Sequence, residues 1–96
     1  MKILHLTLKK KWFDEILKGA KKIEYREIKL YWTKRLFSEG KFPKKFDLIL
    51  FSNGYSKNCR KMKVEFLGVR KGKENYEILL GKILEKPVEG VEPPTY

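Results

Sequence analysis

The stretch GAKKIEYR, residues 19–26, joins two kinds of secondary structure and decides how the first part of the chain folds. In residues 9–18, just before it, apolar side chains recur at one-, three- and four-residue steps, which predicts a helix with one apolar stripe. Residues 21–28 instead alternate between two sets of side chains, as a strand does. Gly19 directly follows the helical pattern, where a left-handed residue often ends a helix. We therefore predict a helix-to-strand turn at Gly19.

The predicted strand places two charged residues of opposite sign on a common face. Successive side chains of a strand point to opposite sides, so Glu24 and Arg26 share one face, while Ile23 and Tyr25 share the other. Glu24 and Arg26 lie about 7 Å apart along such a strand. Two interpretations are open at this point. The pair is an internal ion pair that holds Glu24 in place, or both groups face a ligand.

The remainder of the chain alternates short helices, strands and loops. We expect strands at 2–8, 46–52, 61–72 and 75–85, a short helix at 30–37, loops at 38–45 and 53–60, and an extended proline-rich tail over 87–96 that follows a single domain spanning 1–86. This order predicts an α+β protein that is predominantly β: a small mixed barrel with a helix packed on it. A sandwich is compatible with the same pattern.

Three residues inside these elements carry structural expectations. The helical spacing of Trp12 and Trp32 favours positions in the core over a role as stacking platforms. Gly81 lies within the last predicted strand, where a glycine indicates a bulge or a close approach.

Composition excludes several classes of protein. A chain of 96 residues forms one domain, with a monomer as the default expectation. Its single cysteine, Cys59, and single histidine, His5, make neither an internal disulfide nor a cluster of metal ligands, so we expect no metal and no cofactor. No segment approaches the roughly 18 apolar residues that cross a membrane. The first residues also lack the order of a secretory signal. We expect a soluble cytoplasmic protein.

The charge of the chain is its strongest compositional feature. Lysine and arginine number 23 against 12 acidic residues, which gives a net charge of +11. Such a surplus in a small domain favours a polyanionic partner, most often nucleic acid. A lysine-rich surface that serves only solubility is the alternative. A membrane surface is disfavoured because the sequence has no basic amphipathic helix of useful length.

Four residues carry a resemblance to a known family. Gly19, Lys21, Glu24 and Arg26 form the pattern G-x-K-x-x-E-x-R, which resembles the motif of the ASCH domain family in the PUA-like superfamily. The setting is also similar: an N-terminal strand, a helix with an aromatic residue near its start, the glycine and then the motif strand. The resemblance extends over about residues 2–85, including the late GKILE segment that ends a strand.

The resemblance implies a fold and a class of ligand. It implies a PUA-like barrel of five or six strands with one or two flanking helices, and a cleft beside the barrel that the motif lines. ASCH domains have been proposed as RNA-binding modules. One short bacterial subgroup resembles amidohydrolases that act on N4-acetylcytidine, and another member is associated with ribonuclease activity. The resemblance therefore implies RNA or a nucleotide-like ligand, with a hydrolase as the alternative.

Two motif residues would carry the chemistry of an enzyme. Lys21 matches the family lysine that is proposed to be catalytic in the amidohydrolase subgroup. As a cation it would instead bind a phosphate or a polarised carbonyl oxygen of the ligand. Glu24 stands where that subgroup has a threonine, the proposed nucleophile, and a carboxylate cannot copy a hydroxyl's role directly. It also favours the charged form of a neighbouring lysine, which opposes Lys21 as a base. Glu24 can instead activate water, or accept hydrogen bonds from the amino group of a base.

Three further residues complete the predicted binding site. As an alternative to its ion pair, Arg26 offers a planar fork for phosphate or carboxylate. Tyr55, in the loop after an apolar strand, is a candidate for stacking on a base. Asn53 is included in the ligand-binding set, although the Asn-Gly step of residues 53–54 also suits a role in the turn.

Overall fold

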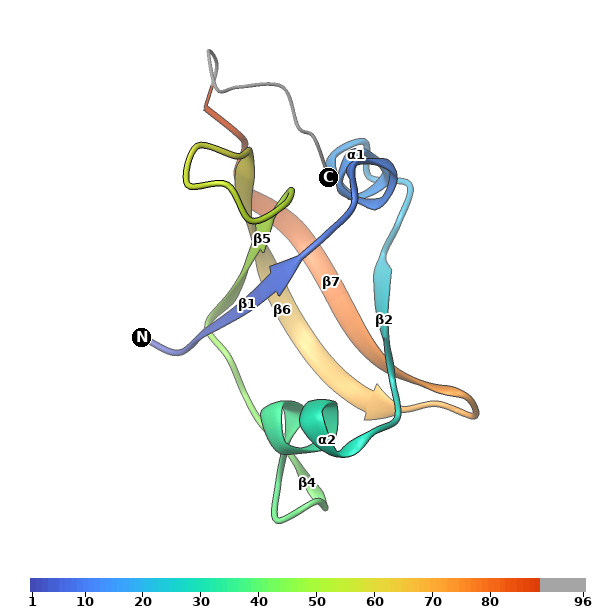
Figure 1. Cartoon of the computed structure of the whole chain (residues 1–96). Coiled ribbons are helices and arrows are strands. Elements are labelled where there is room, and N and C mark those ends of the chain that lie inside the picture. The colour runs from blue at the N-terminus through green and yellow to red at the C-terminus, as the bar shows by residue number, and fades with distance from the viewer. Residues whose placement is uncertain (89–96) are drawn as a thin grey trace.

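Residues 1–88 are described in the computed structural model of this chain (Figure 1). The elements are β1 (Ile3–Thr7), α1 (Lys10–Leu17), β2 (Ile23–Glu27), α2 (Leu30–Leu36), β3 (Phe37–Ser38), β4 (Phe42–Pro43), β5 (Leu48–Ser52), β6 (Lys61–Lys71) and β7 (Asn75–Glu85). The tail predicted over 87–96 lies outside the described residues, apart from residues 87 and 88.

Five strands form one curled sheet in the order β1-β5-β6-β7-β2. β1 runs parallel to β5, and the other neighbours are antiparallel. The sheet curls into a half-barrel whose edge strands, β1 and β2, flank its open side, with α1 near one end of that side and α2 near the other (Figure 1). The predicted α+β class with a predominance of β is confirmed.

The core fills the concave side of this half-barrel. Phe13 and Ile16 of α1 and Leu36 of α2 pack there against buried strand residues such as Phe51 and Ile78. Each of these side chains is at most 3% exposed. The two helices are short, so burial of their apolar faces stabilises them more than helix propensity does.

Gly19 ends α1 as predicted. Its φ is +83°, in the left-handed region that glycine adopts without strain. The N–H of Gly19 donates to the carbonyl of Ile16, and the N–H of Ala20 donates to that of Glu15. These bonds satisfy carbonyls of the last turn, and the chain then leaves the helix axis and enters β2 at Ile23.

Gly81 marks a close approach between β6 and β7. A Cβ at this position would lie 2.3 Å from Oε1 and 2.9 Å from the Cβ of Glu65 on β6. The register of the two strands shifts nearby, between Val64 and Gly68. The prediction of a bulge or a close approach at Gly81 is therefore confirmed.

The stretch predicted as a loop over 38–45 contains part of a small hairpin. β3 pairs with β4, with Phe37 opposite Pro43 and Ser38 opposite Phe42. Glu39 and Gly40 both have positive φ at its turn. Two-residue strands are too short to show a period, and Gly40 and Pro43 are typical of loops, so the sequence indicated a loop. β5 is also shorter than the strand predicted over 46–52, and it begins at Leu48.

Candidate functional site

Glu24 is a buried carboxylate held between two cations of its own motif. Its side chain is only 6% exposed. Oε2 lies 2.9 Å from Nη1 of Arg26, and Oε1 lies 3.4 Å from Nζ of Lys21. Burial of a carboxylate is costly unless it is paired and hydrogen-bonded, and here both oxygens have a cationic partner. The shared face predicted for Glu24 and Arg26 is confirmed, and Lys21 joins them from the turn before β2.

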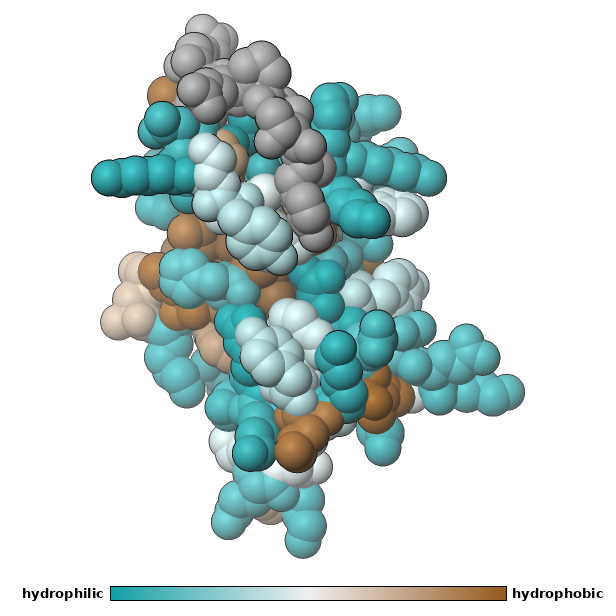
Figure 2. Space-filling view, in the orientation of Figure 1, coloured by the Kyte–Doolittle hydropathy of each residue, from teal (hydrophilic) through white to brown (hydrophobic). Residues whose placement is uncertain are grey.

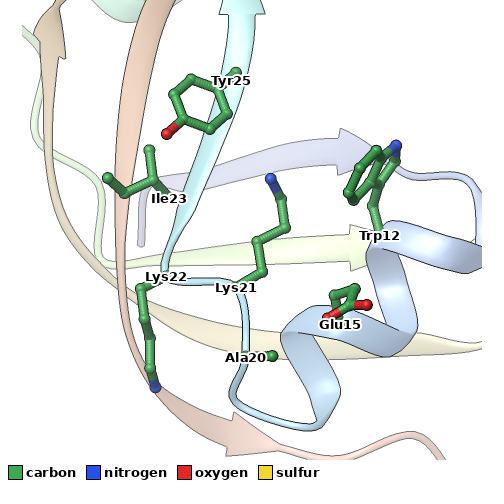
Figure 3. A pocket seen from close by; sticks show the side chains of 7 residues that line it. All are labelled: Trp12, Glu15, Ala20, Lys21, Lys22, Ile23 and Tyr25. Carbon is green, nitrogen blue, oxygen red and sulfur yellow. The ribbon is translucent and has the colours of Figure 1, made fainter.

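Lys21 reaches Glu24 from a slot between two aromatic rings. Its ammonium lies 5.0 Å from the centre of the Trp12 ring and 5.0 Å from that of Tyr25. In Figure 3 the side chain of Lys21 extends between these two residues. Both distances fall within the range of a cation–π contact. The lysine is thus fixed by two rings and a carboxylate.

These side chains line an open pocket on the surface. Its volume is about 380 Å³, near the lower end of the range for small-ligand sites. The lining residues come from α1, the turn after it and the start of β2: Trp12, Glu15, Ala20, Lys21, Lys22, Ile23 and Tyr25 (Figure 3). A pocket of this volume can accommodate a small ligand.

Two arginines fill the open side of the half-barrel beside the pocket. Arg26 of β2 donates from Nη2 to the carbonyl oxygen of Thr7 on β1, at 3.1 Å. Arg35 of α2 donates from Nη2 to the carbonyl of His5, at 3.0 Å. The ring of Trp32 lies 5.0 Å from the guanidinium carbon of Arg26 and 5.2 Å from that of Arg35. Side chains thus bond to carbonyls of the edge strand β1.

The arrangement favours recognition of an anionic or aromatic group. Lys21 and Arg26 are two formal cations against the single carboxylate of Glu24, so the formal charge of the three residues is positive. An ammonium carries three donors, and Glu24 accounts for one contact of Lys21. A phosphate or a carbonyl oxygen that enters the pocket therefore meets a positioned donor next to two rings.

Asn53 lies away from solvent in a second polar cluster. It is 1% exposed, donates from Nδ2 to the carbonyl of Leu8 and accepts a bond of 3.1 Å from Arg60. Arg60 also donates to Asp14 at 2.8 Å, and Lys10 donates to the other oxygen of Asp14 at 2.8 Å. The hydrogen bonds from Lys10 and Arg60 hold the pKa of Asp14 below its ordinary value. In this cluster Asn53 joins the loop after β5 to the chain that follows β1.

Tyr55 occupies the same loop and is 80% exposed. The residues that line the motif pocket all come from residues 12–25. The structure therefore brings Lys21, Glu24 and Arg26 together at the open side of the sheet. It places Asn53 in the cluster with Arg60 and Tyr55 on the surface of the loop.

The prediction that Trp12 is a core residue is wrong. Its side chain is 42% exposed and forms one wall of the pocket. Trp12 lies at the margin of the apolar stripe of α1, whereas Phe13 and Ile16 are buried at its centre. This marginal position was the available signal, because a large ring at the border of a stripe can face either way. Trp32 does pack against the core, as predicted.

Two classes of feature are absent from the described part of the chain. Among residues 1–88, no group of three or more His, Cys, Asp and Glu side chains is placed to hold a metal ion. Neither α1 nor α2, the helices found there, has the length and apolar character needed to cross a membrane.

No family model matches this chain, and comparisons with curated proteins and with solved structures give no match either. The ASCH resemblance of the motif and the PUA-like fold therefore stay predictions.

Proposed function

We propose that this chain is a small basic ASCH-like domain, with a PUA-like half-barrel, that binds RNA or a nucleotide-like ligand in the pocket beside its G-x-K-x-x-E-x-R motif. The proposal joins the net charge of +11 to the composition of the pocket. Nucleotides carry an aromatic base and an anionic phosphate. A pocket with exposed rings and a positioned ammonium complements both.

One observation carries the proposal: the ammonium of Lys21 lies between the rings of Trp12 and Tyr25 and against the buried carboxylate of Glu24. Trp12 and Tyr25 are 42% and 46% exposed, so their rings are available for stacking. Burial and pairing fix the ammonium in place, and a fixed donor loses little rotamer freedom when a ligand binds. The site is thus prepared for binding before the ligand arrives.

In this proposal Glu24 and Arg26 do not bind the ligand themselves. They hold Lys21 in position through the ion pairs of Glu24. Both carboxylate oxygens of Glu24 contact cations, and Arg26 also bonds to Thr7 and lies over Trp32. A carboxylate engaged on both sides orients its neighbours and has little freedom to activate a water molecule. The geometry therefore favours binding over the alternative of hydrolysis of a modified nucleoside or of RNA.

Binding is tested by titrating the protein with adenosine monophosphate and with a single-stranded RNA hexamer while tryptophan fluorescence is recorded, because Trp12 lines the pocket. We expect both to bind. We expect the hexamer's affinity to fall with salt by about 0.7 log units per log unit of salt for each neutralised phosphate. Lys21→Met keeps an unbranched chain between the rings and removes the charge. It should weaken binding at least about tenfold, because a hydrogen bond from a charged group is lost.

Lys57→Ala is the matched control, since it removes one exposed charge from the loop after β5. It should alter affinity only through the overall charge, by much less than Lys21→Met. Equal losses in the two variants, or no binding of either probe, would contradict the proposal. The same wild-type protein incubated with N4-acylated cytidines and RNA oligomers tests the hydrolase alternative. Turnover that Lys21→Met abolishes would favour that alternative.

A further inference from the structure

We infer that the ligand is a single-stranded stretch of RNA, and that Trp12, Tyr25 and Tyr31 each offer a stacking platform for one of its bases. This inference rests on the proposed function and extends it from one pocket to a binding track along the open side of the half-barrel. The track consists of these three rings and the cations that lie over them. Trp12 belongs to α1, Tyr25 to β2 and Tyr31 to α2. These are the elements that border that side (Figure 1).

The three rings are exposed, and each has a cation above it. Their exposed fractions are 42% for Trp12, 46% for Tyr25 and 57% for Tyr31. The distances from cation to ring centre are 4.7 Å for Lys11 to Trp12, 5.0 Å for Lys21 to Trp12, 5.0 Å for Lys21 to Tyr25 and 5.8 Å for Arg35 to Tyr31. Exposure alone does not select these rings, since Phe42 is exposed as well. We group Trp12, Tyr25 and Tyr31 because a cation lies over each ring and because a series of contacts connects them.

A continuous series of contacts links the rings at the two ends. From Trp12 the series passes to Lys21 (5.0 Å), Glu24 (3.4 Å), Arg26 (2.9 Å), Trp32 (5.0 Å) and Tyr31 (4.9 Å). Each step is a cation–π contact, an ion pair or an edge-to-face ring contact. The platforms on α1 and α2 therefore belong to one connected cluster, held at fixed positions by the buried ion pairs of Glu24.

Interleaved rings and cations suit a flexible polyanion with exposed bases. Bases of a single strand stack on aromatic side chains, and the backbone follows a positively charged path. Each cation lies close to one of these rings, so a phosphate next to a base stacked there has a cation within reach. Figure 2 shows hydrophilic side chains over much of the face that carries the open side of the sheet.

The same features disfavour a duplex. Within a duplex, base faces are stacked on their neighbours and cannot reach an aromatic side chain, so rings of this kind recognise unpaired nucleotides. The charge of +11 excludes neither a duplex nor an acidic protein. The three exposed rings favour a single strand, because only unpaired bases can stack on them.

The experiment measures affinity against the length of the ligand. Adenylates of one to six nucleotides are titrated at one fixed ionic strength, together with abasic sugar–phosphate oligomers of the same lengths, which carry the charge without the bases. We expect the adenylates to gain affinity over the abasic oligomers with each added base until the three platforms are filled. Trp12→Ala, Tyr25→Ala and Tyr31→Ala should each weaken binding of the hexamer at least about fivefold.

Tyr31 provides the most specific test, because it lies outside the pocket of Lys21. Tyr31→Ala should weaken binding of the hexamer and leave binding of adenosine monophosphate unchanged. Tyr31→Phe keeps the ring and should bind as the wild type does, even though the contact of Arg35 with the Tyr31 hydroxyl is lost. Phe42→Ala, an exposed aromatic residue on β4, is the matched control and should change neither affinity.

The outcomes separate this inference from the proposed function. If the monophosphate binds through Lys21 but Tyr31→Ala changes the affinity for no adenylate of any length, the proposed binding pocket is supported and the track is wrong. The track is also wrong if abasic oligomers bind as tightly as adenylates, or if an RNA duplex or an acidic peptide binds more tightly than the single strand. If no nucleotide or oligomer binds, the proposed function itself fails.

Discussion

The guanidinium of Arg26 on β2 donates a hydrogen bond to the backbone oxygen of Thr7 on β1, and so a side chain connects the two edge strands of the sheet. The same guanidinium pairs with Glu24 at 2.9 Å and lies over the ring of Trp32. One residue therefore contributes to the stability of the half-barrel and to the geometry of the candidate site. This double role makes Arg26 the first position to test.

Arg26→Lys should destabilise the fold although it keeps the charge. Arg26 contacts Glu24 and Thr7 through two different nitrogens of its planar fork, and an ammonium, as a compact point charge, has no such fork and cannot lie flat on an indole. We expect a loss of about 1.5–3 kcal/mol in the free energy of unfolding, measured with urea, because a hydrogen bond from a charged group is lost. Arg70→Lys, in an exposed pair with Glu77, is the control and should cost less than about 1 kcal/mol. Equal costs would show that Arg26 is an ordinary surface arginine.

Glu24→Gln should reduce the free energy of unfolding by more than the same substitution at an exposed glutamate does. The substitution leaves Lys21 and Arg26 close together without their shared counter-charge. We expect a loss of about 3–5 kcal/mol, the usual cost of breaking a buried ion pair. Glu85→Gln removes the partner of Lys63 from a pair in which Glu85 is 62% exposed, and it should cost less than about 1 kcal/mol. Thermal and urea unfolding of the two variants provide the comparison, and similar values would rule out a structural role for the ion pairs.

Gly19→Ala tests the end of α1. A Cβ at Gly19 would meet no atom closer than Nζ of Lys22 at 3.9 Å, so the cost comes from the left-handed backbone and not from a clash. We expect a loss of about 1–2 kcal/mol in the free energy of unfolding. Gly19→Asn should cost less, because asparagine adopts this conformation more readily. Alanine and asparagine variants of equal stability would contradict this explanation.

Asp14 should make stability depend on pH in the acid range. Its pKa is lower in the folded protein than the ordinary value of 3.8, because Lys10 and Arg60 donate hydrogen bonds to it. The unfolded chain then binds more protons at this group than the folded chain does. The stabilisation is complete above pH 3.8 and is lost as the pH falls through the lowered pKa.

Asp14→Asn should therefore reduce the free energy of unfolding at neutral pH by up to about 1 kcal/mol, since the cluster is partly exposed and screened. The difference from the wild type should shrink as the pH falls below 3.8. Urea unfolding over a series of pH values measures it, with the exposed Glu74→Gln as the control. A difference that stays constant with pH would show that the effect of Asp14→Asn is not electrostatic.

Local signals in the sequence predicted most of the elements. The change of period across Gly19 predicted the helix, the turn and the strand that follow one another there, and the alternation in β2 placed Glu24 and Arg26 on one face. Each of these features depends on neighbours in the chain. A pattern of a few residues was therefore enough to specify them.

The parts that were missed depend on contacts between distant segments. The position of Trp12 at the margin of the apolar stripe of α1 left its direction open, because that direction depends on where α1 lies against the sheet. The bonds from Arg26 and Arg35 to carbonyls of β1 follow from the curl of the sheet, which no short pattern encodes. The position of Asn53 beside Arg60 likewise arises from packing of the loop after β5.

The sheet order has a consequence for the sequence of folding events. β5, β6 and β7 follow one another in the chain and pair as neighbours, whereas Ile3 must find Leu48 and Ile23 must find Leu79. Long loop closures are slow and entropically costly, so we expect the C-terminal meander to form first and β1 and β2 to dock onto it later. Every residue that lines the motif pocket belongs to the late-docking segment. The meander alone therefore lacks this pocket, and a ligand bound there would stabilise the product of the last step of assembly.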